Sequence, residues 1–166
     1  MLFIVPAEEK HIPGILRLLV QVNMVHHLGR PDLFKGPTTK YDEAELKALL
    51  ADPLHRIFVC LGEDGQVLGH AFCEWQETTE TRLLQPVTTL YVDDICVEET
   101  CRRQGVGKAL FDRVREEAAV SGCDHITLNV WELNPGARRF YEACGLLPLK
   151  TTMELRLKGS EDPTGP

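Results

Sequence analysis

The sequence lacks long hydrophobic runs, paired-cysteine motifs and an excess of basic residues. No apolar stretch approaches the roughly 20 residues that a membrane-spanning helix needs, so we expect no membrane partner. The start of the chain has no basic segment before its short apolar run, so we expect no signal peptide. The six cysteines form no C-x-x-C pair and no metal-like cluster, which favours a reduced, cytoplasmic protein that binds no metal. The formal net charge of −7 disfavours nucleic acid as a partner, because the chain would repel its phosphates.

The length and composition of the chain indicate one globular domain. The chain has 166 residues, and 43% of them are hydrophobic, which is enough for an ordinary core. No repeat and no linker-like segment interrupts it. We expect a single domain over residues 1–158 and a flexible tail over residues 159–166, which are polar and contain proline and glycine.

Apolar periodicity predicts helices and strands in the order β-α-α-β-β-β-α-β-α-β. The expected strands are Leu2–Val5, Arg56–Leu61, Val67–Trp75, Val87–Val97 and Ile126–Trp131, with a last strand or hairpin within Leu146–Leu157. The expected helices are Glu8–Gln21, Tyr41–Ala51, Gly105–Val120 and Asn134–Cys144. The stretch Asn23–Pro37 holds two prolines, two glycines and two adjacent histidines, and we expect it to be irregular.

The segment Cys101–Lys108 reads C-R-R-Q-G-V-G-K and lies between an expected strand and an expected helix. Glycines allow the backbone to approach a ligand, and the free N–H groups at the start of a helix favour an anion. The sequence therefore predicts a site for a phosphate-bearing ligand. Two common phosphate motifs are excluded: Leu110 stands where a dinucleotide fingerprint needs a third glycine, and Arg102 and Ala109 stand where a Walker loop needs Gly and Ser or Thr.

Two separate motifs resemble one family. The pattern R-x-x-G-x-G, which follows a strand reading L-Y-V-D-D-I-C-V, resembles the acetyl-coenzyme A signature of the GCN5-related N-acetyltransferase (GNAT) superfamily. The later segment T-L-N-V-W-E-L-N-P-G-A-R-R-F-Y-E-A-C-G-L resembles a second motif of that family. The residues at the motif places are Arg102, Gly105 and Gly107 in the first segment, and Asn134, Ala137, Phe140, Tyr141, Gly145 and Leu146 in the second.

The resemblance implies an α/β (α+β) fold and a binding site for acetyl-CoA. The implied fold is a mixed, mostly antiparallel sheet of six to seven strands with helices on both faces. Its two central strands, ending near Val97 and Trp131, would splay apart to admit the pantetheine arm. The residues implied in cofactor binding are Ile95, Cys96 and Val97 along the arm, Arg102, Arg103, Gln104, Gly105, Val106, Gly107 and Lys108 at the pyrophosphate, and Asn134 and Tyr141 across the splay.

The resemblance also implies a catalytic tyrosine and a catalytic acid. A tyrosine at the place of Tyr141 donates a proton to the departing thiolate in the family, although Tyr141 could instead serve ordinary packing. An ordinary phenol has a pKa near 10 and a thiol one near 8.5, so this transfer needs good placement. Asp93 is the candidate base, directly or through water, unless it only satisfies backbone N–H groups. Strand alternation points Asp93 and Asp94 to opposite faces, but a β-bulge would change the phase, so the choice between them stays open.

The expected acceptor side lies in the stretch after the first helix and late in the first hairpin. Loops carry specificity more often than cores do, but polar loop residues are also commonly just exposed. Metal binding by the adjacent histidines is disfavoured, because neighbouring side chains diverge. The candidate substrate-binding residues are His26, His27, Arg30, Phe34 and Glu74.

The resulting functional hypothesis is an acetyl-CoA-dependent N-acetyltransferase. A primary amine, with a small amine favoured by the acidic chain, would attack the thioester directly in a ternary complex. Cys96 could carry the acyl group instead, but a buried strand thiol is expected to be inert. Two alternatives stay open, a protein or peptide N-acetyltransferase and a non-catalytic acyl-CoA sensor. The sequence does not decide between a monomer and a homodimer.

Overall fold

The computed structural model describes residues 1–158, and the tail predicted over residues 159–166 lies outside them. The strands are β1 (Phe3–Pro6), β2 (His55–Leu61), β3 (Val67–Thr78), β4 (Val87–Val97) and β5 (His125–Leu128). The helices are α1 (Ile12–Gly29), α2 (Glu43–Ala51), α3 (Val106–Val120) and α4 (Pro135–Ala143), with short 3-10 turns at Glu9–His11 and Glu99–Cys101. Within the described residues, no helix is both long enough and apolar enough to span a membrane.

The strands form one sheet in the order β1-β2-β3-β4-β5. The first four strands are antiparallel neighbours, whereas β5 runs parallel to β4. The sheet is therefore mixed and mostly antiparallel, as predicted. It has five strands within the described residues, so the expectation of six to seven was wrong in this detail.

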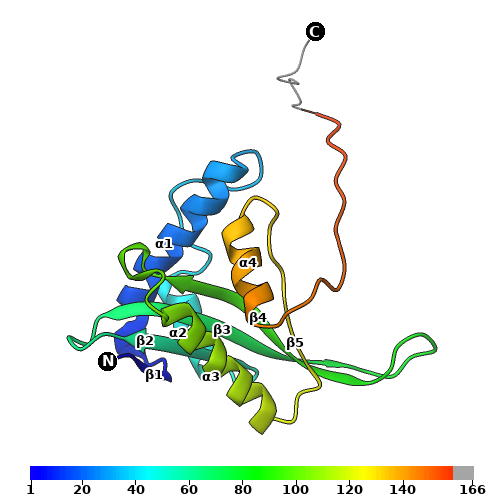
Figure 1. Cartoon of the computed structure of the whole chain (residues 1–166), viewed down its shortest axis with the longest axis horizontal. Coiled ribbons are helices and arrows are strands. Elements are labelled where there is room, and N and C mark those ends of the chain that lie inside the picture. Colours follow the sequence, from blue (N-terminus) through cyan, green and yellow to red (C-terminus); the bar gives the residue numbers. More distant parts are fainter. Residues whose placement is uncertain (159–166) are drawn as a thin grey trace.

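Helices cover both faces of the sheet, as expected (Figure 1). Because side chains alternate along a strand, β2 supplies apolar residues to two cores. On one face, α1 and α2 pack with Ile57 and Val59. On the other face, α3 packs with Phe58 and Cys60. The regular 3.6-residue spacing of apolar positions in α3 produces its buried stripe of Val106, Leu110, Phe111, Val114 and Ala118.

Two predicted elements differ in the structure. The helix expected to end at Gln21 continues to Gly29, because both prolines of the stretch Asn23–Pro37 lie beyond that glycine and only its second half is irregular. The strand or hairpin expected within Leu146–Leu157 is not formed. This segment leaves the end of α4 and runs away from the sheet (Figure 1), so its backbone has no neighbouring strand to pair with.

Among the described residues the sheet opens between its last two strands, where β4 and β5 separate. Their pairing runs from Thr89 opposite His125 to Val92 opposite Leu128, while β4 continues to Val97. The expected splay of the central strands is therefore present, although β5 ends at Leu128 and not near Trp131. The opening exposes one backbone edge in the middle of the fold.

Candidate active site

The last residues of β4 present free backbone groups toward the opening. The Glu98 N–H donates to the Leu68 carbonyl of the β3 segment at 2.8 Å. Backbone groups alternate between the two edges of a strand, so those of Ile95 and Val97 face away from β3. On this side, Arg102 Nε donates to the Val97 carbonyl oxygen at 3.4 Å, a long hydrogen bond. A ligand with amide groups can add to this edge as a further strand would.

The basic glycine turn leads directly into α3. Arg103 and Gly105 have positive φ angles of 63° and 85°, so the chain turns sharply before the helix begins. No side chain of the described residues caps this helix. The N–H groups of its first residues therefore point out free, which is the arrangement that binds an anion. Lys108, one of the basic residues predicted to bind the pyrophosphate, forms an ion pair with Asp112, and its Nζ lies 2.5 Å from Oδ2.

Gly107 also has a packing role that the sequence reading missed. A Cβ atom at Gly107 would lie 3.3 Å from the ring of Phe140 in α4. The start of α3 and the middle of α4 therefore approach closely. Asn134 holds the start of α4, because its side-chain oxygen accepts a hydrogen bond from the Ala137 N–H at 3.1 Å.

A β-bulge brings the two adjacent carboxylates to one face of β4. Phe72 pairs with Asp94 and Cys73 pairs with Val92, so Asp93 is the extra residue of the bulge. Both Asp93 oxygens are occupied: Oδ1 accepts from Lys40 Nζ at 2.6 Å and Oδ2 from the Tyr41 hydroxyl at 2.9 Å. The sequence left the phase of this strand open, and the bulge decides it.

Asp94 is held by a buried histidine that the sequence analysis missed. The Nε2 atom of His70 lies 2.7 Å from Asp94 Oδ2, which fits an N–H donor at that nitrogen. His70 is fully buried, and its other ring nitrogen has no partner among the described residues. The available signal was a single histidine inside the apolar run Val67–Cys73. Its pairing with Asp94 depends on strand register.

Tyr141 lies on α4 near Asp93 and Asp94, which together form the acidic centre of the site. Its ring makes edge contacts with Phe140 and Phe111, at centroid distances of 5.1 and 6.4 Å. Burial raises the pKa of the Tyr141 phenol, and the charge of Asp94 raises it further. Tyr141 therefore keeps its proton at neutral pH and senses Asp94 electrostatically.

Cys96 is a buried thiol with little nucleophilic character. Burial raises its pKa to about 12, so very little thiolate exists at neutral pH. Its Sγ donates to the Leu18 carbonyl of α1 at 3.4 Å, and the side chain belongs to the core under α1. The side chain is thus structural, whichever contacts its backbone makes.

Three aromatic rings gather beside the acidic centre. The ring centroid of His26, at the end of α1, lies 4.9 Å from that of Phe34. The ring centroid of Phe34 lies 5.1 Å from that of Trp131, which follows β5. Burial lowers the pKa of His26, partly offset by Asp94, so its imidazole is neutral at physiological pH. Trp131 was not among the predicted site residues, and it remains 44% exposed.

The other predicted acceptor residues have local partners. His27 Nδ1 lies 2.7 Å from the Phe34 carbonyl and so fixes the loop that carries Phe34. Arg30 forms ion pairs with Asp32 and Glu154, which occupy its guanidinium. Glu74 lies on β3 opposite Tyr91 and accepts from the Gln76 side chain at 3.2 Å.

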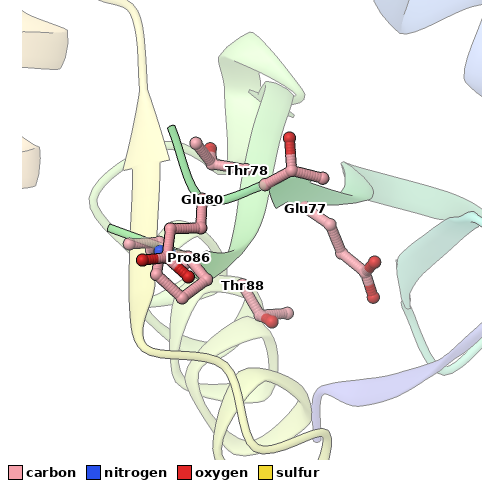
Figure 2. Close-up of a pocket in the computed structure, with 7 residues that line it drawn as sticks. Glu77, Thr78, Glu80, Pro86 and Thr88 are labelled. Atoms are coloured by element: carbon pink, nitrogen blue, oxygen red, sulfur yellow. The ribbon is translucent and has the colours of Figure 1, made fainter. Parts of the chain in front are cut away.

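A surface hollow lies elsewhere, at the far end of the β3–β4 hairpin. Figure 2 shows it lined by Glu77, Thr78, Thr79, Glu80, Pro86, Val87 and Thr88. Thr78, which pairs with Val87, lies six residues along β3 from Phe72, which pairs with Asp94, and this corresponds to roughly 20 Å. Asp93 and Asp94 therefore do not line this hollow.

Comparison with known proteins identifies the family. A family model described as Acetyltransferase (GNAT) family matches residues 22–146, more than half of the chain. The structure is similar to a tetramutant of the BH1408 protein from Bacillus halodurans, with a TM-score of 0.90 and 27% identity over 93% of this chain and 99% of that one.

Two more distant solved structures share the fold. An aminoglycoside acetyltransferase from an uncultured soil metagenomic sample, solved with sisomicin, has a TM-score of 0.71 and 18% identity, covering 96% of this chain and 97% of that one. Glucosamine-6-phosphate N-acetyltransferase from Arabidopsis thaliana has a TM-score of 0.69 and 18% identity, covering 95% and 99%. The comparison with curated proteins finds no match. The fold, the two motifs and the family match agree, and the chain belongs to the GNAT family of acetyltransferases.

Proposed function

We propose that this protein transfers an acetyl group from acetyl-CoA to a small primary amine. The observation that carries the proposal is the position of Asp93 and Asp94 on one face of β4, next to the free backbone edge of Ile95 and Val97. A proton acceptor, Asp94, thus directly precedes Ile95, the first residue of a binding edge for an amide-rich ligand. Acetyl-CoA supplies an acetyl group already activated as a thioester.

The residues that would hold acetyl-CoA fit its chemistry. The backbone groups of Ile95 and Val97 can pair with the amides of the pantetheine arm, and the Val97 N–H can donate to a developing oxyanion. The free N–H groups at the start of α3 can hold the pyrophosphate, with cationic support from Arg102 and Arg103. Arg102 would exchange its long contact with the Val97 carbonyl for a phosphate contact.

The residue best suited to receive the proton of the amine is Asp94. An amine attacks only in its neutral form, and a lysine-like amine has a pKa near 10.4, so a base beside it accelerates the reaction. Asp93 has both oxygens bound to donors, whereas Asp94 uses Oδ2 for His70 and keeps Oδ1 available, directly or through water. His70 would act as a positioning residue that fixes the carboxylate.

Tyr141 is proposed to face the departing sulfur. Its raised pKa keeps a proton on the hydroxyl oxygen in the resting enzyme. The same raised pKa makes complete transfer to a thiolate unfavourable, so the main contribution is a hydrogen bond donated by that hydroxyl as charge develops on sulfur. This role refines that of a simple proton donor.

The acceptor site favours a cationic amine with an apolar part. Asp93 and Asp94 supply negative charge, and the rings of His26, Phe34 and Trp131 supply apolar and π surfaces beside it. An ammonium group is attracted both by carboxylates and by aromatic faces. A peptide amine remains the second acceptor class to test.

The experiment is release of free thiol from acetyl-CoA with a panel of polyamines, amino acids, amino sugars and short peptides, and with calorimetric CoA binding measured alongside. We expect turnover with at least one small amine. Tyr141→Phe should lower kcat by about 10- to 100-fold with CoA affinity nearly unchanged, because only transition-state charge loses a donor. Tyr91→Phe, a tyrosine on β4 hydrogen-bonded to Asn129, is the matched control and should keep turnover.

Other outcomes contradict the proposal at defined points. CoA binding without turnover on any amine would indicate a sensor, and turnover on peptides alone would replace the acceptor class. Absence of CoA binding would overturn the assignment of the β4 edge and the α3 start.

A further inference from the structure

Asp93 already binds one ammonium group, that of Lys40. Lys40 Nζ lies 2.6 Å from Asp93 Oδ1 and 5.5 Å from the centroid of the Tyr41 ring. The Tyr41 hydroxyl donates to the other carboxylate oxygen, Asp93 Oδ2, at 2.9 Å. A carboxylate and an aromatic face are groups that attract an ammonium ion, so Asp93 and Tyr41 together have the chemistry of an ammonium site.

This ammonium site is fixed in the fold, whereas its occupant can exchange. The Tyr41 ring stacks on Phe72 of β3 at a centroid distance of 5.7 Å, and Asp93 is the bulged residue of β4. The Asp93 side chain is only 19% exposed, but the Lys40 side chain is 52% exposed and comes from the loop between α1 and α2. A partly exposed ion pair contributes little free energy, so another cation can replace the Lys40 ammonium.

The ammonium site lies beside the position proposed for the reacting amine. Asp94, which would take up the proton of that amine, directly follows Asp93 on the same face of β4. Burial lowers the pKa of His26, the charge of Asp94 raises it, and the charge of Lys40 lowers it. Both charges therefore act on the same ring of the acceptor side, which supports a position of the Lys40 ammonium within the acceptor site.

The two carboxylates suit two different nitrogen atoms of an acceptor. The reacting nitrogen must be neutral when it attacks, whereas a carboxylate beside an ammonium group stabilises the protonated form. A second alkylamine with a pKa near 10.4 stays protonated at neutral pH and therefore suits Asp93. Because neighbouring Cα atoms lie about 3.8 Å apart, a short alkyl chain can join a nitrogen at Asp94 to a nitrogen at Asp93.

We propose that Asp93 and Tyr41 form a subsite for a second ammonium group of the acceptor, and that Lys40 fills this subsite until the acceptor displaces it. The inference rests on the proposed acetyl transfer and narrows its acceptor to a short-chain diamine. One nitrogen stays protonated at Asp93. The other, neutral nitrogen forms the new C–N bond as the C–S bond breaks, its proton passes to Asp94, and the thiolate of CoA leaves. Lys40 then determines specificity, because only a second positive charge can take its place.

The test compares diaminobutane with aminobutanol, which has the same length and a hydroxyl in place of one ammonium group. Calorimetric binding to the enzyme with bound CoA needs no turnover, and steady-state thiol release gives KM and kcat. The wild type should bind diaminobutane about tenfold more tightly than aminobutanol, and Asp93→Asn should remove this preference. Lys40→Met should lower the KM for diaminobutane by about two- to fivefold and should not lower that for aminobutanol. A merely structural role of Lys40 would change both amines alike.

Lys47→Met is the matched control, because Lys47 pairs with Glu43 of α2 at 2.9 Å and its side chain is similarly exposed, at 47%. It removes the same charge and should leave both KM values unchanged. Equal affinity of the wild type for the two amines, or no gain in diaminobutane affinity in Lys40→Met, would overturn the subsite. Thiol release with other amines would then leave the proposed acetyl transfer intact. Absence of thiol release with every amine would instead refute acetyl transfer, while the binding of diaminobutane still decides the subsite.

Discussion

The clearest functional prediction is that Asp94 matters far more for turnover than its neighbour Asp93. Asp94→Asn keeps the size of the side chain, and the amide oxygen can still accept from His70, so the local fold should survive. It removes the only group at this position that can take up a proton. Asp93→Asn keeps contact with Tyr41 and weakens the ion pair with Lys40, whose side chain is 52% exposed.

The expected changes in kcat and in folding stability follow from the roles and contacts of the two carboxylates. A positioned general base contributes about 10²–10⁴ in rate, so Asp94→Asn should lower kcat by about 1,000-fold, equivalent to about 4 kcal/mol in activation free energy. The cost in stability should be about 1 kcal/mol, because a charge-assisted hydrogen bond to His70 becomes a neutral one. Asp93→Asn should change kcat by less than about tenfold, since a half-exposed ion pair contributes little.

The assay is steady-state thiol release with the best amine of the panel, together with calorimetric CoA binding for each variant. Both variants should bind CoA as the wild type does, because neither substitution touches the edge of Ile95 and Val97. If Asp93→Asn loses as much activity as Asp94→Asn, or more, the choice based on free carboxylate oxygens is refuted.

Further predictions concern the thiol, the sheet and the tyrosines. Cys96→Ala should leave turnover, measured by thiol release, close to that of the wild type, because the Cys96 thiol has a pKa of about 12 and forms very little thiolate. Complete loss of activity in a folded variant would favour an acyl-enzyme. In Gly69→Ala, the new Cβ would lie 2.9 Å from the Cys96 carbonyl oxygen and from Leu110. The variant should therefore lose about 2 kcal/mol of folding stability, and its melting temperature should fall by roughly 4–8 °C. An unchanged calorimetric melting temperature would contradict this close approach. Burial raises the pKa of Tyr41 and of Tyr141, so both phenols should stay protonated near pH 11 while the chain is folded. Since the unfolded chain releases these protons near pH 10 and the folded chain retains them, stability should fall as pH rises above 10, which parallel ultraviolet titration and denaturant unfolding can check.

Much of the fold could be predicted because its elements carry strong local signals. The bounds of β4 match the prediction at both ends, Val87 and Val97, and α3 begins one residue after the expected Gly105. Alternating apolar residues and a glycine before an amphipathic helix act over a few residues, so they are readable without tertiary contacts. The segment Leu146–Leu157 after α4 carried an equally clear alternating pattern, but a strand also needs a partner, and pattern alone does not provide one.

The candidate site was less predictable, because its chemistry depends on register. Asp93 and Asp94 were visible as a pair, yet their shared face results from a bulge opposite Phe72 and Cys73. His70 stands 24 residues before Asp94, and only cross-strand pairing brings the two within 2.7 Å. The aromatic group likewise joins a residue of α1 to Trp131, which follows β5.

The sequence by itself determined the family, the glycine turn at the start of α3 and the succession of helices and strands. These features are local, since each is encoded in residue types at short, regular spacings. Only the tertiary structure decided which of the two carboxylates keeps an oxygen free, which histidine supports it, and that the apolar side chains of Leu146–Leu157 are left exposed. Those properties arise from strand register and from contacts between distant segments, and a one-residue bulge is enough to reverse the face on which a side chain lies.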